Sequence, residues 1–181
     1  LRLSIYGGER SVQESRINER LEDLEAILGD AMYSDEDETL ETCIGKLLKG
    51  TGMTISTAES CTGGTIAAML TSVAGSSEYY LGSVVSYANN VKTEVLGVDE
   101  KILVRHGAVS SECVAAMADG VRKLTGSDFS IATSGIAGPG GGSDAKPVGL
   151  VWIGVSSQKS TDTFSMVFKG DRKRNIERFA A

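Results

Sequence analysis

Histidine is almost absent from this sequence, since His106 is the only one in 181 residues. The three cysteines, Cys43, Cys61 and Cys113, lie far apart along the chain. A zinc site usually draws on several cysteine and histidine ligands that lie close together. We therefore expect no metal site and no cofactor. A serine nucleophile with a histidine base would have to use His106, and its surroundings favour a plain turn residue near the start of a helix.

Long apolar runs and an excess of positive charge are also missing. No run approaches the roughly 20 apolar residues of a membrane-spanning helix, and 18 Lys and Arg against 24 Asp and Glu give a net charge of −6. This balance argues against nucleic acid or a membrane as partner. The odd number of separated cysteines indicates reduced thiols, and we expect a cytoplasmic protein. Two prolines and 22 glycines indicate tight turns rather than disorder.

The first 33 residues have the pattern of one strand and one helix. The alternation in residues 1–6 predicts a half-buried strand. Ser11 and Glu14 have the spacing of a capping box, and Gly29 is placed to end the helix that follows. One strand and one helix cannot make a domain. We therefore interpret residues 1–33 as the remnant of a preceding domain.

Residues 34–39 are acidic and are interpreted as a solvated linker. The remainder, residues 40–181, alternates between helical and strand patterns, which predicts an α/β fold with a single mixed β-sheet and helices packed on its faces. The expected strands cover residues 53–59, 83–88, 128–135, 150–157 and 161–170. The expected helices cover residues 40–48, 64–72, 89–97, 110–126 and 171–181. We expect the last helix to be incomplete.

The stretch "TISTAESCTGGTIAAML", residues 54–70, is the first candidate site. A strand pattern stops at Glu59, and the next residues are Ser60, Cys61, Thr62, Gly63 and Gly64. In open α/β sheets, ligands bind beyond the carboxyl ends of strands, where helix N-termini present free N–H groups. The stretch lacks the G-x-S-x-G pattern of α/β-hydrolases. It nevertheless places two nucleophile candidates on one turn.

The residues alone do not decide between Ser60 and Cys61 as nucleophile. A thiol is intrinsically the better nucleophile, and a helix N-terminus would lower its pKa. Free cysteine is also among the most buried residue types. A serine hydroxyl needs a base, and the segment "SYANNVK" offers Tyr87 and Lys92. Lysine serves as a base when its pKa is lowered, which desolvation and nearby helix N-termini favour. The tyrosine could relay the proton or orient the amine.

A glycine-rich segment, "TSGIAGPGGG", forms the third candidate site. Successive N–H groups of such a loop can bind an anion, and Arg172 adds a cation near a helix start. The candidate ligands of a phosphate are Ser134, Gly135, Gly138, Gly140 and Arg172. By itself a glycine-rich loop is as often a plain connector.

Taken together, these motifs resemble the C-terminal domain of the CinA family. The segments that carry the resemblance are "AESCTGG", "VVSYANNVK", "GAVSSE", "TSGIAGPGGG…KPVGLVWIGV" and "GDR", and they follow one another over roughly residues 37–181. Residues 1–33 resemble the end of the segment that precedes this domain in two-domain CinA proteins, after a molybdopterin-binding-like domain. Because five motifs occur in order, the resemblance is highly specific.

The resemblance implies a nicotinamide-nucleotide amidohydrolase, which converts nicotinamide mononucleotide to nicotinate mononucleotide and ammonia. It places the catalytic serine on Ser60, the tyrosine on Tyr87 and the lysine on Lys92. The N–H groups from Cys61 to Gly64 are then candidates for the oxyanion site. The expected partners are the nucleotide substrate and, for assembly, a second copy of the chain. Two alternatives remain: a nucleotide-binding module without its own catalysis, and an interaction module of a competence or damage-response assembly.

Overall fold

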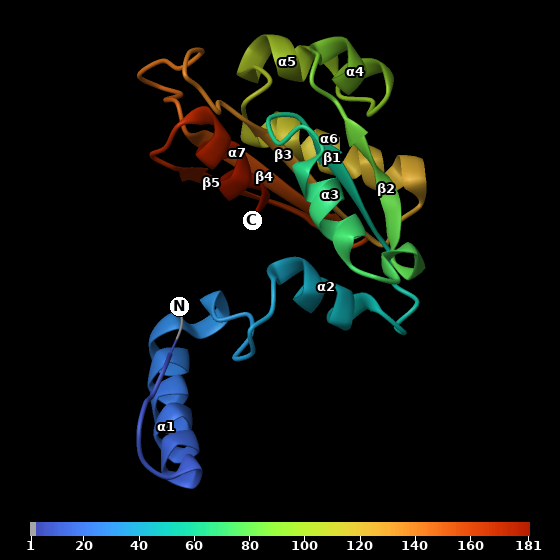
Figure 1. Ribbon diagram of the computed structural model, residues 1–181. Helices are drawn as coiled ribbons and strands as arrows, with labels where there is room; N and C mark the ends of the chain where they lie inside the picture. The colour runs from blue at the N-terminus through green and yellow to red at the C-terminus, as the bar shows by residue number, and fades with distance from the viewer. Residues whose placement is uncertain (1–2) are drawn as a thin grey trace. The chain divides into compact units, whose positions relative to one another are not determined.

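The structure, a computed structural model, describes residues 3–181 (Figure 1). The chain forms two units, of which the first ends at Cys43 and the second runs from Ile44 to Ala181. Helix α2, Leu40–Leu48, spans the boundary between them. The candidate site residues all belong to the second unit.

The first unit contains helix α1, Arg10–Leu28, and a short 3₁₀ helix, Gly29–Ala31. The expected strand is wrong: residues 3–6 have no strand conformation, and residues 1 and 2 lie outside the described part of the chain. A lone strand would leave its backbone groups without a neighbouring strand. The expected capping box is also wrong, because α1 begins one residue before Ser11, after Glu9, without a side-chain cap. The stop at Gly29 is confirmed by its positive φ of 51°.

The second unit is built on one mixed five-stranded sheet, which confirms the expected α/β fold. Its strands are β1 Ile55–Glu59, β2 Tyr80–Val85, β3 Phe129–Gly135, β4 Leu150–Ser157 and β5 Thr161–Val167. The spatial order is β2-β1-β3-β4-β5. β1 pairs in parallel with β2 and β3, whereas β3–β4 and β4–β5 are antiparallel. The carboxyl ends of β1, β2 and β3 therefore meet at one edge.

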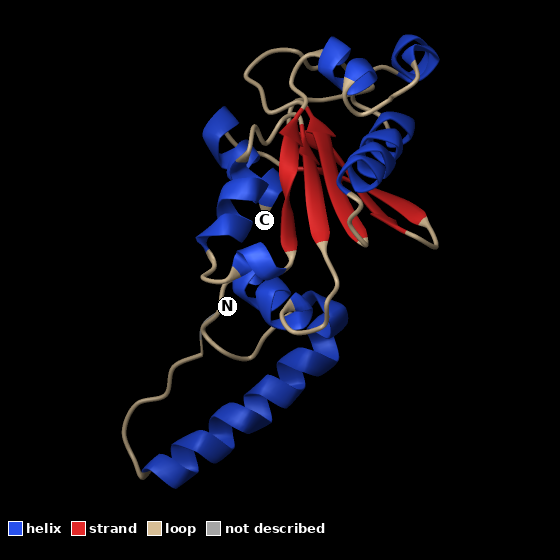
Figure 2. Cartoon of the chain, turned by 90° about the vertical axis from the view of Figure 1, so that its right-hand side faces the viewer, coloured by secondary structure: helices blue, strands red, loops and turns tan. Residues whose placement is uncertain are grey.

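Helices cover both faces of this sheet and also lie beyond the carboxyl ends of its parallel strands, as Figure 2 shows. They are α3 Thr65–Ser72, the 3₁₀ helix Ser76–Glu78, α4 Asn89–Glu94, α5 Glu100–His106, α6 Ser111–Thr125 and α7 Arg172–Ala180. Helix α5 was not expected, and His106 is its last residue rather than a turn residue. Its start is set by Asp99, whose side chain accepts a hydrogen bond from the N–H of Lys101. In residues 3–181 no helix combines the length and hydrophobicity that crossing a bilayer requires.

The core has one apolar layer on each side of the sheet. On one side α6 contributes a fully buried stripe that includes Met117 and Val121 and packs on Ala58 of β1 and Ala132 of β3. On the other side lies a smaller cluster formed by Cys61, Ala137, Val151 and Phe179. These layers fix the strand ends and the loops that leave them.

Helix α6 approaches the segment after α4 very closely at Gly120. A Cβ atom at this position would overlap the carbonyl oxygen of Leu96. The same segment is anchored to α4 by a 3.0 Å hydrogen bond from the N–H of Val98 to the carbonyl of Lys92. Glycine at position 120 therefore allows α6 to support the helix that carries Lys92.

Replacing Gly120 by alanine tests this close approach. Alanine in a helix is normally favoured over glycine by about 1 kcal/mol, but here the added methyl group must displace backbone, and overpacking usually costs about 1–3 kcal/mol. We expect Gly120→Ala to lower the free energy of unfolding by about that amount in urea titrations. Gly140→Ala is the control, because nothing lies within 4 Å of a Cβ there. A Gly120→Ala protein as stable as the wild type would contradict the packing described.

Candidate active site

A cavity of about 200 Å³ lies where the carboxyl ends of β1, β2 and β3 meet. Seven of the residues singled out from the sequence line it: Ser60, Cys61, Tyr87, Lys92, Ser134, Gly135 and Arg172. Four lining residues were missed: Asn89, Ala108, Val109 and Ala137. Ala108, Val109 and Ala137 are small or apolar, and Asn89 is the first residue of the short helix α4. No sequence motif distinguishes these four residues.

Ser60 and Lys92 are in direct contact at this cavity. The Nζ atom of Lys92 donates a hydrogen bond to Oγ of Ser60 at 3.0 Å and another to the carbonyl oxygen of Ser86 at 2.5 Å. The backbone of Ser60 is itself held by a 3.0 Å hydrogen bond from its N–H to the carbonyl of Thr133 on β3. A hydroxyl and an amine at this distance have the geometry of a nucleophile and its base.

Lys92 is only 1% exposed, although it carries an amine. Burial lowers the pKa of this amine, and the neighbouring thiols of Cys113 and Cys61 act weakly in the opposite direction. Within residues 3–181, no carboxylate forms an ion pair with it. The sequence analysis attributed part of the lowering to helix N-termini, but Lys92 lies in the last turn of α4. Desolvation, which disfavours the charged form, is therefore the cause.

Cys61 lines the cavity, but its side chain is packed into the core. It is buried in the cluster with Ala137, Val151 and Phe179. Burial raises the pKa of its thiol to about 12, the reverse of what a helix N-terminus would do. A thiol that stays protonated is a poor nucleophile. The structure therefore favours Ser60 over Cys61.

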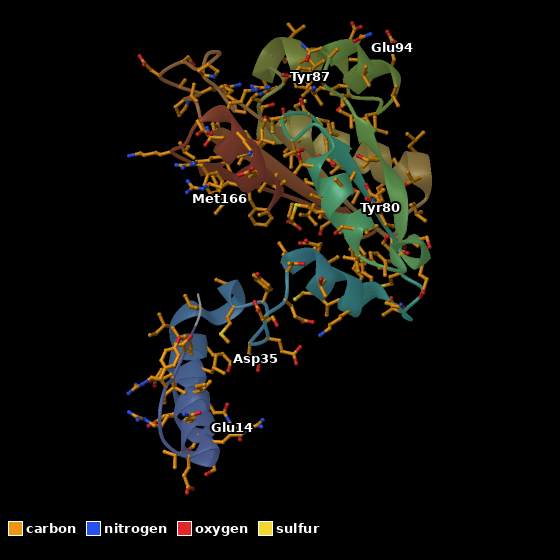
Figure 3. The ribbon with its side chains drawn as sticks, in the orientation of Figure 1. Glu14, Asp35, Tyr80, Tyr87, Glu94 and Met166 are labelled. Atoms are coloured by element: carbon orange, nitrogen blue, oxygen red, sulfur yellow. The ribbon has the colours of Figure 1, made fainter. Side chains whose placement is uncertain are left out.

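Tyr87 lies at the mouth of the cavity and not between Ser60 and Lys92. Its side chain is 64% exposed, and its hydroxyl accepts a 3.2 Å hydrogen bond from Nη2 of Arg172. In the described chain it has no hydrogen bond to Ser60 or Lys92, so the expected proton relay is not formed. Figure 3 labels Tyr87 near α4 and α5, with Tyr80 at the other end of β2.

Arg172 connects the glycine-rich loop to the cavity mouth. Its Nη1 atom donates to the carbonyl of Gly138 at 2.8 Å. Gly138 has a φ of +85°, and Gly138 and Gly140 do not line the cavity, so the loop is held beside it rather than within it. Gly135 does line the cavity, and a Cβ there would meet the carbonyl oxygen of Leu150 at 2.6 Å.

Ser134 and Thr62 have hydroxyl groups that are already used within the protein. Oγ of Ser134 donates to the carbonyl of Ala108 at 2.7 Å, and Oγ1 of Thr62 is 2.8 Å from Oγ1 of Thr133. Both side chains are buried. Ser134 lines the cavity and its hydroxyl oxygen can still accept a hydrogen bond, whereas Thr62 does not line the cavity.

The N–H groups of the turn after Ser60 are only partly available. The N–H of Gly64 donates to Oε2 of Glu59 at 2.9 Å, which removes Gly64 from the expected oxyanion donors. The N–H groups of Cys61, Thr62 and Gly63 have no hydrogen bond to another of the described residues. These three remain as candidate donors.

His106 takes no part in this site. Its Nδ1 atom lies 3.2 Å from Oε1 of Glu112, and it does not line the cavity. Over residues 3–181, no three His, Cys, Asp or Glu side chains are grouped as a metal site would require. The hydrogen-bonded Ser60–Lys92 pair is therefore the candidate reactive pair at this cavity.

The fold and site define an α/β protein in which a partly buried serine contacts a buried lysine at the carboxyl ends of the parallel strands of a mixed sheet. The family model of the CinA C-terminal domain matches residues 37–181, and the chain belongs to the CinA family. A CinA-like protein from Chloroherpeton thalassium is 45% identical over 184 residues, covering 99% of this chain and 44% of that protein. The chain thus spans less than half the length of the curated relatives it matches.

Solved structures share the fold as well. The competence damage-inducible protein A from Klebsiella pneumoniae superposes with a TM-score of 0.75 at 38% identity, covering 78% of this chain and 88% of that one. The competence/damage inducible protein CihA from Agrobacterium tumefaciens gives a TM-score of 0.70 at 32% identity, covering 98% and 93%. Both agree with the mixed sheet described above.

The buried thiol of Cys61 allows a direct chemical test. With a pKa near 12, its thiolate fraction at pH 8 is roughly a thousandfold below that of an ordinary cysteine. We expect iodoacetamide to modify Cys61 correspondingly slowly in the folded protein and rapidly in urea, measured by peptide mass spectrometry. Because the pKa is raised, the rate should climb as the pH increases. Equal rates in folded and unfolded protein would contradict this.

Proposed function

We propose that this chain hydrolyses the carboxamide of nicotinamide mononucleotide, with Ser60 as nucleophile and Lys92 as its base. The observation that carries the proposal is the 3.0 Å hydrogen bond between Lys92 Nζ and Ser60 Oγ. A buried amine without a carboxylate partner favours the neutral form that a base requires. The resemblance to the CinA C-terminal domain, which implies a nicotinamide-nucleotide amidohydrolase, supports the choice of substrate.

In the first half-reaction, Oγ of Ser60 attacks the carboxamide carbon while its proton passes to Nζ of Lys92. The carbonyl oxygen becomes an oxyanion, and the N–H groups of Cys61, Thr62 and Gly63 are the candidate donors to it. Collapse of this intermediate breaks the C–N bond. The ammonium of Lys92 returns its proton to the leaving nitrogen, which departs as ammonia, and an ester on Ser60 remains.

In the second half-reaction, water takes the place that ammonia left. Lys92 accepts a proton from the water, whose oxygen attacks the ester carbon. The C–O bond to Ser60 breaks, the proton returns to Oγ of Ser60, and nicotinate mononucleotide leaves. The same amine serves both steps, so its loss should impair acylation and deacylation together.

The size of the cavity fits only part of a nucleotide. Pockets for drug-sized ligands usually hold about 300–1,000 Å³, whereas this one holds about 200 Å³. We propose that the pyridine carboxamide enters the cavity and that the ribose phosphate stays at its mouth. Arg172 and the exposed ring of Tyr87 lie there, as a charge partner for phosphate and an apolar surface. This gives Tyr87 a role in holding substrate instead of the relay.

The first test compares the two adjacent nucleophile candidates. Ser60→Ala removes the attacking oxygen, and we expect nearly all ammonia release from nicotinamide mononucleotide to disappear. Cys61→Ala is the matched control on the neighbouring residue and should retain most of the activity. Loss of activity only with the cysteine variant would refute the serine assignment. A chain that binds the nucleotide but releases no ammonia would favour a binding module instead.

The second test asks whether Lys92 acts as a base. Lys92→Met keeps the length of the side chain without the amine, and a general base contributes about 100- to 10,000-fold, so we expect kcat to fall by that order. Lys92→Arg should also fail because guanidinium stays charged.

The direction in which activity changes with pH tests whether Lys92 acts as a base. Because burial lowers the pKa of Lys92, kcat/KM should rise with pH through that lowered pKa and be lost as the amine is protonated at lower pH.

Near-full activity of Lys92→Arg would show that position 92 supplies a fixed positive charge and no base.

A further inference from the structure

Glu59 is fully buried, although it carries a carboxylate and directly precedes Ser60. Its Oε2 atom accepts hydrogen bonds from the N–H groups of Gly64 at 2.9 Å and Ile66 at 3.2 Å. Its Oε1 atom accepts one from the N–H of Ala67 at 2.8 Å. The carboxylate thus binds the first turn of α3, five to eight residues further along the chain.

This contact replaces an ordinary helix cap. The N-cap of α3 is Gly64, which has no side chain and a φ of 99°. Helix starts leave N–H groups unsatisfied and carry partial positive charge. A buried carboxylate is costly unless such donors surround it. Glu59 and α3 therefore satisfy one another, and the start of α3 is no longer open to a substrate anion.

The backbone of the same residue holds the other half of the reactive pair. The carbonyl of Glu59 accepts a 2.8 Å hydrogen bond from the N–H of Ser86. The carbonyl of Ser86 in turn accepts from Nζ of Lys92. The side chain of Glu59 thus binds Gly64, at the end of the turn that follows Ser60. Its backbone carbonyl binds Ser86, whose own carbonyl accepts a hydrogen bond from Lys92.

The carboxylate is also kept out of an ion pair with the base. The titratable groups that act on Lys92 are the thiols of Cys61 and Cys113. Glu59 satisfies its oxygens on α3 instead. A carboxylate paired with the amine would favour the ammonium form. Its engagement by backbone N–H groups leaves Lys92 able to lose its proton.

We infer that Glu59 is a positioning residue. It holds the turn of residues 60–63 against α3 and so keeps Oγ of Ser60 within hydrogen-bonding distance of Nζ of Lys92. The kinetic test of this inference rests on the proposed function. The chemical reactivity of Ser60 provides a second test that needs no amide substrate. A misplacement on the order of 1 Å can cost about 100-fold in rate. A residue that only stabilised the fold would not change the rate of the folded enzyme.

Glu59→Gln is the variant that tests this, since glutamine keeps the length but turns one acceptor into a donor that faces an N–H group. We expect kcat for nicotinamide mononucleotide to fall by about 10- to 100-fold, with KM little changed and with the midpoint of the pH–rate profile unchanged. Asp99→Ala is the matched control, because it removes the cap of α5 outside the cavity. Its kcat should stay at the wild-type value despite a lower Tm.

Labelling by a fluorophosphonate, located by mass spectrometry, reports the reactivity of Ser60 without any amide substrate. We expect slower labelling of Ser60 in Glu59→Gln and unchanged labelling in Asp99→Ala. If Glu59→Gln does not fold, Glu59→Asp, which keeps the charge but is one methylene shorter, should show the same slowing.

Three results would overturn the inference. The first is wild-type kcat and wild-type labelling of Ser60 in the Glu59 variant. The second is a loss of activity that Asp99→Ala reproduces when its Tm falls by the same amount. The third is a shifted midpoint of the pH–rate profile, which would make Glu59 a charge partner of Lys92. A wild-type protein that labels at Ser60 but releases no ammonia would refute the proposed substrate only. The labelling rates would then decide the role of Glu59.

Discussion

The site depends on one constraint, namely that an amine is held out of water with few partners. Lys92 finds two acceptors in its buried position, the hydroxyl of Ser60 and the carbonyl of Ser86. Charging it there is unfavourable, because two neutral acceptors replace only part of its hydration. Much of the surrounding architecture can be understood as support for this arrangement: β1 and β2 deliver the two acceptors, and α6 backs the segment that follows α4.

The support is rigid because it is made from backbone and tightly packed small groups. Gly120 lets α6 touch the carbonyl of Leu96, and Gly135 lets β3 pass close to β4 beside the cavity. Interiors packed this closely transmit small displacements. Changes at such positions, although outside the reactive pair, therefore act on the distance between Ser60 and Lys92.

Hydrophobic periodicity predicted the mixed sheet and most of its elements. The residues offered Lys92 as one possible base, and the resemblance to the CinA family implied that it acts with Ser60. The sequence did not predict α5, whose signal is a single N-cap at Asp99. The orientation of Cys61 and the outward position of Tyr87 depend on how the turn and β2 end in three dimensions, which alternation cannot fix. Glu59 was overlooked because its partners are backbone N–H groups, and these have no signature in the side-chain pattern.

Arg172 has one more consequence at the mouth of the cavity. It is bonded to the carbonyl of Gly138 and the hydroxyl of Tyr87, and no carboxylate pairs with it in the described residues. The net charge of −6 arises in the first unit, because residues 44–181 carry 14 Lys and Arg against 12 Asp and Glu. An uncompensated guanidinium at the opening is therefore a local positive charge on a slightly basic unit, and it draws anions to the cavity. At an ionic strength near 0.15 M, where screening acts over about 8 Å, such guidance operates only in the last stage of an encounter.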